Sequence, residues 1–383
     1  MLGFRPLPGK GGRNNGLSGM WLLRRLKLRG GGFGPRFVSG FLAGSLFGST
    51  GCALALHWYR EPEREEGQRE HIKDNLIEKY GLPVTGTDVH HCTNHVSSYD
   101  QAKRTPRWVL EHITKEKLQG EADRKHCKFK PDPNILPLFS ATNEDYIRSG
   151  WSRGHMAPAG DNKFSAQAMA ETFYLSNIVP QNFENNAGFW NRLEMYCREL
   201  TQRYDNVWVI SGPLTLPLMG ADGKKTVTYQ VIGKNEVAVP THLYKIILVQ
   251  KGKAPSELLA LGAFVVPNSP IGFDHQLSEY QIDLQDLEKM SGVTFFPALD
   301  KTKQCHDLCE TDTCKLLNFA DFTQYITGRK MKNARTLQGL EKIMGELRES
   351  GIEPDEYLQN LYLKKKQEVE WKEAAESRAA KAG

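Results

Sequence analysis

Short apolar segments separated by turn residues set the tightest limit on what this chain can fold into. They are rich in Val, Ile and Leu, as is typical of strands buried in a sheet. Helical segments lie between them without the regular alternation of a βαβ fold, so we predict an α+β fold around a central, mostly antiparallel sheet. The predicted strands are residues 108–113, 207–211 followed by a Gly212-Pro213 turn, 226–232, 242–249 and 259–266.

Helical periodicity predicts two longer helices. Apolar residues at spacings of 3, 4 and 3 give residues 187–203 an amphipathic character, and the same spacing recurs over residues 337–347. Gly351 ends the second of these helices, and Pro354 can begin the next, which continues into a segment rich in Lys, Glu and Ala. Shorter helices are predicted at residues 168–174 and 286–290.

The first 36 residues contain eight basic residues and no acidic one, which is typical of a mitochondrial import signal. The next 23 residues contain no Asp, Glu, Lys or Arg, and a helix of that length can span ~30 Å of hydrocarbon. We therefore predict a targeting leader over residues 1–36, a transmembrane anchor over residues 37–59 and a solvated linker over residues 60–73.

The basic leader also predicts the orientation of the anchor. Basic residues stay on the side from which a segment inserts, so the globular body should face away from the leader. In mitochondria this places the body in the intermembrane space, tethered to the inner membrane through residues 37–59. A cleaved secretory signal is the alternative. The length of the leader and of the apolar segment favours an uncleaved anchor.

The positive net charge is confined to the leader. Removing its eight basic charges from the formal net charge of +5 leaves −3 for residues 37–383. Attraction to a polyanion must therefore come from local clusters rather than from the global field. Such basic runs are most often solvated faces. Two of them are Arg124, Lys125, Lys128 and Lys130, and then Arg329, Lys330, Lys332 and Arg335, which precede the predicted C-terminal helices.

The seven cysteines have irregular spacing and indicate no disulfide framework. One cluster, formed by Cys305, His306, Cys309 and Cys314, contains residue types that bind zinc. Its C-x3-C-x4-C spacing differs from the paired C-x2-C spacing of structural zinc sites. We interpret it as a surface helix and loop with reduced thiols, with a structural zinc as the alternative. No P-loop or G-x-G-x-x-G motif occurs, so no nucleotide cofactor is indicated.

The segment that begins at Trp151, Trp-Ser-Arg-Gly-His-Met-Ala-Pro-Ala, combines residues suited to phosphate chemistry. A neutral His155 can take a proton from water. The guanidinium of Arg153 matches the geometry of phosphate oxygens. Gly154 lets the backbone come close to a ligand. A single histidine is more often structural, so this motif alone does not establish a catalytic site.

A cluster of amide side chains precedes the predicted helix over residues 187–203. Asn186 lies where that helix should begin, so it is either a helix N-cap or a metal ligand. Glu194 follows eight residues later, ~12 Å along a helix axis, and the two side chains cannot both bind one ion directly. Glu194 would instead order waters around a metal on Asn186. Mg²⁺ tolerates such a site, made of one amide oxygen, substrate phosphate and several waters.

Together these segments resemble the DNA/RNA non-specific endonuclease family, which has a D-R-G-H motif and a ββα-metal active site. The resemblance is closest to its mitochondrial, endonuclease G-like exo/endonuclease branch. It implies a ββα-metal nuclease core over residues 74–310 and a C-terminal helical wing and tail over residues 311–383. The matching segments are WSRGHMAPAG from Trp151, FYLSNIVPQ from Phe173, WNRLE from Trp190, WVISGP from Trp208, DLEKMSG from Asp286 and FFP from Phe295.

The resemblance assigns catalytic roles to individual residues. It implies that His155 is the general base and that Asn186 binds Mg²⁺ directly, with Mn²⁺ as a substitute. It implies that Glu194 holds the metal through water. Arg124 and Arg153 match arginines that bind the substrate phosphate, and Arg153 belongs to the catalytic motif itself.

Three further positions match residues around the site. Asn177 and Gln181 match amides that shape it. Ser152 departs from the family, since most members have Asp there. The exo/endonuclease branch resembles this chain in carrying Ser, so the departure puts in doubt only the positioning role of that carboxylate.

The residues and the resemblance lead to a Mg²⁺-dependent phosphodiesterase of mitochondria that acts as a 5′-exonuclease and endonuclease, on DNA preferentially and on RNA as an alternative. The resemblance implies 5′-phosphate and 3′-hydroxyl products, a homodimer, and a wing that blocks passage of a strand. Two alternatives remain open. One is a purely endonucleolytic member of the family, and the other is an inactive, membrane-tethered protein that binds nucleic acid.

Overall fold

The computed structural model describes residues 76–82, 89–252 and 258–382 of the chain. The predicted leader (1–36), anchor (37–59) and linker (60–73) lie outside the described residues. Among the residues that are described, no helix is both long enough and apolar enough to cross a membrane. The membrane anchor therefore stays a prediction from the sequence.

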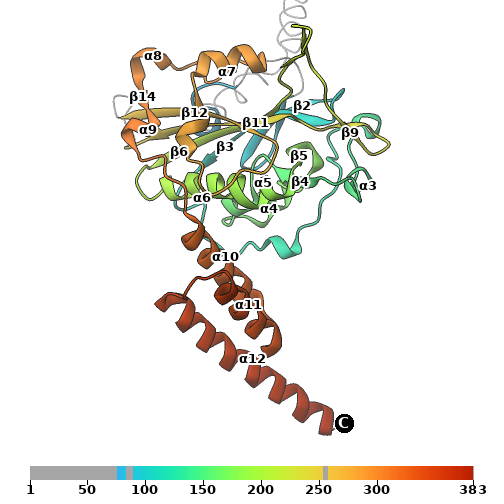
Figure 1. The fold of residues 1–383 in the computed structure, drawn as a ribbon, viewed down its shortest axis with the longest axis vertical. Coiled ribbons are helices and arrows are strands. Elements are labelled where there is room, and N and C mark those ends of the chain that lie inside the picture. The colour runs from blue at the N-terminus through green and yellow to red at the C-terminus, as the bar shows by residue number, and fades with distance from the viewer. Residues whose placement is uncertain (1–75, 83–88, 253–257, 383) are drawn as a thin grey trace, which may run out of the picture. The chain divides into compact units, whose positions relative to one another are not determined.

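A central sheet of eight strands organises the described residues (Figure 1). The strand order is β1-β2-β3-β6-β11-β12-β13 with antiparallel pairing throughout, and β14 pairs with β12 in parallel. The predicted α+β fold around a mostly antiparallel sheet is confirmed. The strands are β1 (Val89–His91), β2 (His95–Asp100), β3 (Thr105–Ile113), β6 (Asn206–Leu214), β11 (His242–Gln250), β12 (Leu259–Pro267), β13 (Gln281–Ile282) and β14 (Cys305–Asp307).

The central strands form where apolar residues follow one another without interruption. The strand predictions at 207–211, 242–249 and 259–266 are confirmed by β6, β11 and β12. The turn predicted at Gly212 is wrong, because β6 continues to Leu214. Glycine is required there for another reason. A Cβ at Gly212 would lie 2.5 Å from the Arg107 carbonyl oxygen.

The strand predicted at 226–232 is also wrong. Its ends belong to two small hairpins, in which β8 pairs with β7 and β9 pairs with β10. Val227 and Tyr229 between them are exposed, so these two residues have no second layer to pack against. The strands are β7 (Leu218–Met219), β8 (Lys225–Thr226), β9 (Val231–Ile232) and β10 (Val237–Ala238).

Side-chain alternation gives the central sheet two buried faces. On β6, Val207 and Val209 point to one face, while Trp208 and Ile210 point to the other. The first, which we call the catalytic face, packs against α6 (Asn191–Leu200). The second, the distal face, packs against α7 (Leu284–Ser291) and residues 293–299. Figure 1 shows α6 below the sheet and α7 above it.

The helix predicted at 187–203 is confirmed in α6, but the helical run begins earlier. It starts with α5 (Phe183–Asn185) and passes through a π-helical segment, η6 (Asn186–Trp190), before α6. The N-cap is Asn182, whose side-chain oxygen accepts a hydrogen bond from the Asn185 backbone N–H at 3.0 Å. Asn186 lies inside the helical run, so it is not the helix N-cap.

The remaining helices of the core are short. The predictions at 168–174 and 286–290 correspond to α4 and α7, each shifted by two or more residues at one end. The other α-helices and 3-10 helices are α3 (Asn143–Tyr146), α4 (Ala166–Glu171), α8 (Lys301–Gln304), α9 (Leu308–Thr311), η1 (Leu76–Glu78), η2 (Arg124–His126), η3 (Pro137–Phe139), η4 (Ala159–Asp161), η5 (Leu175–Asn177) and η7 (Leu277–Tyr280).

Three C-terminal helices pack around an apolar cluster of their own. They are α10 (Phe319–Asn333), α11 (Leu337–Glu349) and α12 (Glu356–Ala382). Gly351 follows α11 with a φ of +75°, as a helix stop requires. The second basic run precedes α11 and α12 as predicted, but Arg329, Lys330 and Lys332 belong to α10, a helix that the sequence did not predict.

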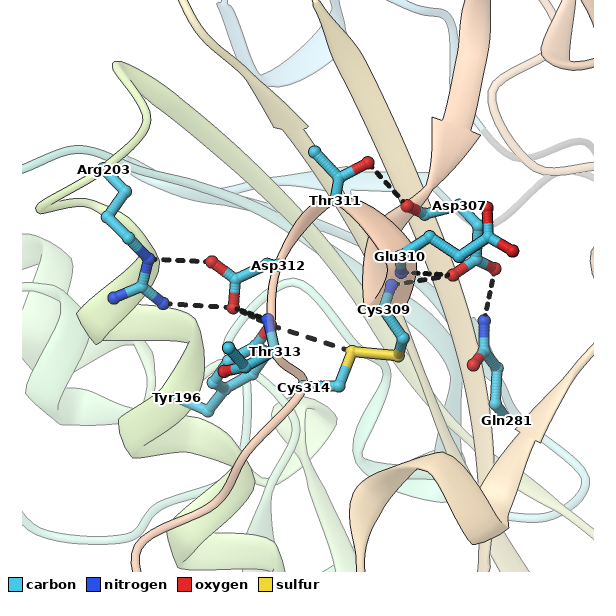
Figure 2. The surroundings of a disulfide bond; sticks show 10 residues. All are labelled: Tyr196, Arg203, Gln281, Asp307, Cys309, Glu310, Thr311, Asp312, Thr313 and Cys314. Carbon is cyan, nitrogen blue, oxygen red and sulfur yellow. Dashed lines mark hydrogen bonds and ion pairs between the residues drawn. A yellow bond between two sulfur atoms is a disulfide. The ribbon is translucent and has the colours of Figure 1, made fainter.

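Cys309 and Cys314 form a disulfide (Figure 2), so the prediction of reduced thiols at these positions is wrong. The chain turns back after α9 and brings the two sulfur atoms together, which spacing alone does not reveal. Asp312 lies inside this loop and accepts hydrogen bonds from the Tyr196 hydroxyl at 2.8 Å and from Arg203 Nε at 2.7 Å. The segment that leads into α10 is thereby fixed to α6 and the turn after it.

Candidate active site

The motif segment forms the first strand of a ββα unit. β4 (Ser152–His155) pairs antiparallel with β5 (Ile178–Gln181), and Asn182 alone separates β5 from the helical run that begins with α5. The register pairs Ser152 with Gln181 and His155 with Ile178. This arrangement brings the motif, which precedes the helix by about thirty residues in the sequence, against the first turns of that helix.

One cavity of about 440 Å³ brings together most of the predicted site residues. His155, Arg153, Asn186, Glu194 and Arg124 all line it. The two predicted site-shaping amides, Asn177 and Gln181, are buried and do not line it. The cavity therefore unites residues from β4, the helical run and η2.

His155 is held by two aromatic rings. The centroid of its ring lies 5.3 Å from that of Phe129 and 5.0 Å from that of Phe173. Neither ring nitrogen of His155 makes a hydrogen bond to a described residue, and Nε2 is enclosed. Burial, with a smaller effect from Arg124, lowers the pKa of His155 to about 3. The imidazole is therefore neutral at physiological pH and able to accept a proton.

Ser152 orients the amide of Asn186. Asn186 Nδ2 donates to Ser152 Oγ at 3.0 Å, and the Ser152 hydroxyl donates to the Gln181 carbonyl oxygen at 2.7 Å. With its nitrogen engaged in this way, the side-chain oxygen of Asn186 accepts no hydrogen bond from the described residues. An unused amide oxygen on the cavity wall is a suitable ligand for Mg²⁺.

Glu194 supplies the carboxylate of the cavity. Burial raises the pKa of Glu194 to about 7, against the opposing effects of Arg198 and Lys245. Arg198 is itself held by Asp161, with 2.7 Å between Nη1 and Oδ1. In the described residues, no group of three or more His, Cys, Asp or Glu side chains could hold a metal ion. The Asn186 side-chain oxygen and the Glu194 carboxylate are oxygen donors, the kind that a hard divalent cation binds.

Four arginines line the cavity, and Arg124 and Arg153 are the two predicted to bind the substrate phosphate. The guanidinium of Arg153 lies 5.3 Å from the ring centroids of both Phe129 and Tyr146, and Nη2 donates to the Asn143 carbonyl oxygen at 3.1 Å. Arg124 is exposed and lies 5.9 Å from the Phe173 ring. Neither arginine has a carboxylate partner among the described residues, so both can bind an anionic ligand.

Asn177 and Gln181 act behind the cavity wall. The Asn177 side chain accepts from the Ala157 N–H at 2.9 Å and donates to the Ala157 carbonyl oxygen at 2.9 Å, which brackets the chain just after His155. Gln181 Nε2 donates to Asn185 Oδ1 at 2.8 Å. Gln181 also explains Gly154, where a Cβ would lie 2.1 Å from Gln181 Oε1. Both amides therefore shape the site without entering it.

Sequence reasoning missed several residues around the site. Phe129 has no motif that marks it, yet its ring packs on both His155 and Arg153. Trp190 was recognised as part of a helical pattern and of the matching WNRLE segment but was given no role, although its Nε1 donates to the His155 carbonyl oxygen at 3.3 Å. Arg329 was seen only as one of a basic run, but it lines the cavity from α10. The contacts of all three depend on chain segments that are distant in the sequence.

A family model described as DNA/RNA non-specific endonuclease matches residues 73–302, which is more than half of the chain. The chain belongs to the DNA/RNA non-specific endonuclease family. A second model, the endo/exonuclease (EXOG) C-terminal domain, matches residues 317–365 of the chain, the region of α10, α11 and α12.

Several curated relatives of the chain carry mitochondrial names. It is 60% identical over 338 residues to mitochondrial nuclease EXOG of Xenopus laevis, with 88% of this chain and 94% of the relative covered. It is 59% identical over 344 residues to mitochondrial nuclease EXOG of Homo sapiens, again with 88% and 94% covered. Mitochondrial endonuclease G of Homo sapiens is 42% identical over 221 residues, with 58% of this chain and 73% of the relative covered.

A solved structure supports the ββα-metal assignment of the fold. The crystal structure of the EndoG/EndoGI complex matches with a TM-score of 0.57 and 43% identity, over 60% of this chain and 93% of that one. The chain is therefore a nuclease of the non-specific endonuclease family, similar to proteins named as mitochondrial nucleases.

Proposed function

We propose that the chain is a Mg²⁺-dependent phosphodiesterase that cleaves DNA in mitochondria, as a 5′-exonuclease and as an endonuclease. One observation carries the proposal. A neutral imidazole, an unused amide oxygen, a carboxylate and two unpaired arginines line a single cavity, namely His155, Asn186, Glu194, Arg124 and Arg153.

His155 is the general base of the proposed reaction. Its neutral imidazole takes a proton from water, which then attacks phosphorus in line with the leaving oxygen. Phe129 and Phe173 hold the ring plane, while Trp190 holds the strand through the His155 carbonyl oxygen. A bound phosphate opposes the effect of Arg124 and raises the pKa of His155, so the base becomes stronger where substrate is present.

Arg124 and Arg153 bind the substrate phosphate. Arg153 is fixed by Asn143 and two aromatic rings, so it can position one phosphate oxygen at little further loss of side-chain entropy. Arg124 is exposed on η2, so its side chain can adjust to the position of the substrate. These contacts recognise the backbone rather than the bases, which supports a nuclease without sequence specificity.

Asn186 would hold Mg²⁺ directly and Glu194 would hold it through water, with Mn²⁺ as a substitute. When bound, the metal supplies positive charge that stabilises the charge developing on the phosphate and on the leaving 3′-oxygen. Ser152 keeps the Asn186 oxygen available by engaging its nitrogen. Glu194 must be ionised for its part, and a nearby cation lowers its raised pKa.

The wing supports the 5′-exonuclease part of the proposal. α10 contributes Arg329 to the wall of the cavity, so this helix borders the space that a nucleic-acid strand must occupy. A strand end fits such a bordered site more readily than a continuous duplex. A purely endonucleolytic enzyme is the alternative.

The setting of the enzyme rests on the sequence. We place the chain at the inner mitochondrial membrane through residues 37–59, with the nuclease body in the intermembrane space, because residues 1–36 are basic and acid-free. The family resemblance supports a homodimer. RNA is an alternative substrate, since none of the phosphate contacts requires a deoxyribose.

Cleavage assays with His155→Ala test the proposal. The purified chain is given a 5′-labelled linear duplex and closed circular DNA, with Mg²⁺ or with a chelator. We expect metal-dependent cleavage that falls by about 10²–10⁴-fold in His155→Ala, the usual contribution of a general base. His306→Ala, at an exposed histidine outside the cavity, is the control and should cleave normally.

The substrate comparison decides between the alternatives. Faster cleavage of the labelled end than of circular DNA supports the 5′-exonuclease activity, and cleavage of circles alone supports a pure endonuclease. If folded wild type binds DNA but cleaves nothing with Mg²⁺ or Mn²⁺, the result favours an inactive protein that binds nucleic acid.

A further inference from the structure

Phe183 is an exposed aromatic side chain in the wall of the catalytic cavity. It is 69% exposed, although aromatic side chains gain most of their stabilising energy from burial. Of the large apolar side chains that are exposed in the described part of the chain, Phe183 alone lines this cavity. Folding therefore leaves its apolar surface free at the place where substrate must bind.

The other aromatic ring that lines the cavity already has a role. Phe129 packs against the rings and cations that form the site, including His155 and Arg153. Phe183 has no ring or cation contact with any described residue and belongs to none of the buried apolar clusters. Its ring is thus available to a ligand.

The backbone beneath Phe183 is rigidly anchored. The preceding N–H of Asn182 donates to Asn268 Oδ1 at 2.8 Å, and the Asn182 side chain caps the helical run. Asn185 Nδ2 donates to the carbonyl oxygens of Pro267 and Ser269, each at 3.1 Å. Residues on both sides of Phe183 are therefore tied to the end of β12 and the segment after it, which fixes the backbone position from which the ring projects.

The position of Phe183 indicates what the ring binds. It lies three residues before Asn186 in one helical run, which is ~5 Å along the axis. The arginines and Asn186 hold the phosphate side of the cavity, so the next group of a nucleic acid to reach Phe183 is a base beside the scissile phosphate. An aromatic ring accepts any base, because every base has a π face.

We propose that Phe183 is a stacking platform for the nucleobase next to the scissile phosphate. This inference rests on the proposed nuclease function and deepens it. It gives the cavity one contact that recognises a base and not only the backbone, without sequence preference. Binding through this ring is lost wherever that base is missing.

A cycle of two changes tests the proposal, one in the enzyme and one in the substrate. KM and kcat are measured with Mg²⁺ for a single-stranded oligonucleotide and for the same oligonucleotide with abasic residues on both sides of the scissile bond. The enzymes are wild type, Phe183→Ala and Phe183→Trp. Phe164→Ala is the matched control, since Phe164 is 41% exposed and does not line the cavity.

We expect Phe183→Ala to raise KM for the natural oligonucleotide by about tenfold or more with little change in kcat, as the loss of one base stack predicts. Phe183→Trp should keep the wild-type KM, which shows that the position folds and stacks. The abasic oligonucleotide should bind wild type as weakly as Phe183→Ala, and the two changes together should add nothing.

Three results overturn the proposal, and they differ from one another. If wild type cleaves the oligonucleotide and Phe183→Ala has the same KM while remaining folded, Phe183 does not bind a base and the nuclease assignment is unaffected. If the abasic residues raise KM by the same factor for wild type and for Phe183→Ala, another part of the protein binds the missing base. A wild type that cleaves no oligonucleotide refutes the nuclease proposal and the inference with it.

Discussion

The two faces of the central sheet are both buried, but they bury different kinds of residue. The distal face packs aromatic and aliphatic side chains from the sheet, such as Trp108, Trp208 and Tyr244, against Phe295 and Phe296. The catalytic face has comparable apolar residues on β6 and β11. It also places polar and ionisable side chains among them, in particular Glu111, Ser211 and Lys245.

The ionisable residues of the catalytic face lie directly behind the active site. Lys245 Nζ donates to Ser211 Oγ at 2.6 Å and lies 4.5 Å from the ring centroid of Trp190, which in turn holds the His155 strand. Burial raises the pKa of Glu111 well above its usual value, with Lys245 opposing the shift. The catalytic face buries ionisable side chains, in place of apolar ones, to support the site. We infer that apolar packing on the distal face offsets the stability that this costs.

Phe295→Ala should have the largest effect on stability, because it removes a fully buried ring from the distal face. We expect the free energy of unfolding to fall by about 3–5 kcal/mol. The activity of the molecules that remain folded should be unchanged. Chemical denaturation and steady-state kinetics below the unfolding transition measure the two quantities. A tenfold fall in kcat/KM of the folded enzyme would show that the faces are not independent.

Gly154→Ala should have the opposite pattern to Phe295→Ala, with a smaller loss of stability and a larger loss of activity. The new Cβ would lie 2.1 Å from Gln181 Oε1, so β4 and β5 must separate. We expect a loss of about 1–3 kcal/mol in stability, as overpacking produces. Activity should fall on the order of 10²-fold, because the displacement misplaces His155. Gly345→Ala, which has open space on α11, is the control and should leave the activity unchanged.

Glu194→Gln should stabilise the metal-free protein while abolishing activity. The pKa of Glu194 is raised to about 7 in the folded state, so its contribution to stability is full below about pH 4.5 and is lost as the pH rises through 7. At pH 8 the ionised, buried carboxylate is therefore destabilising. We expect the variant to gain on the order of 2 kcal/mol at pH 8 and nothing at pH 4.

Thermal unfolding with a chelator at the two pH values measures this difference. A gain of equal size at both would show that packing, rather than ionisation of Glu194, is responsible. The pH dependence of stability also distinguishes the two faces, because few of the buried residues on the distal face titrate.

Trp190→Phe should have the smallest effect. It removes the hydrogen bond to the His155 carbonyl oxygen, at 3.3 Å, while keeping a ring beneath Lys245. We expect a loss of about 1 kcal/mol in stability, as for one hydrogen bond. A modest fall in kcat with constant KM should accompany it. An unchanged kcat would mean that Trp190 supports the fold alone.

The sequence predicted the parts of the fold that depend on uninterrupted patterns. β6, β11 and β12 are buried on both sides, so each shows as a continuous apolar run. The segment over residues 226–232 is also rich in β-formers, but Val227, Tyr229 and Val231 are exposed, and the segment forms parts of two hairpins instead. Composition shows what a segment can bury, and only the tertiary structure decides whether it does.

The sequence predicted which residues form the site better than it predicted the contacts among them. The motif segments and the family resemblance named His155, Asn186 and Glu194, and the structure places all three in one cavity. The sequence could not show that Ser152 engages Asn186 across 34 residues, or that Cys309 and Cys314 are joined. Such contacts depend on how the chain returns on itself, which local spacing does not encode. The metal, the anchor and the homodimer stay predictions.

Because Ser152 carries a hydroxyl group, the hydrogen bond that orients Asn186 does not depend on pH. A hydroxyl group neither gains nor loses a proton at any pH where the protein is folded, so its hydrogen bond to Asn186 is constant. A carboxyl group in the same place would change from acceptor to donor on protonation. Among the side chains that line the cavity, His155 and Glu194 are then the groups that respond to acid, and the direction of the Asn186 oxygen does not depend on the protonation of its partner.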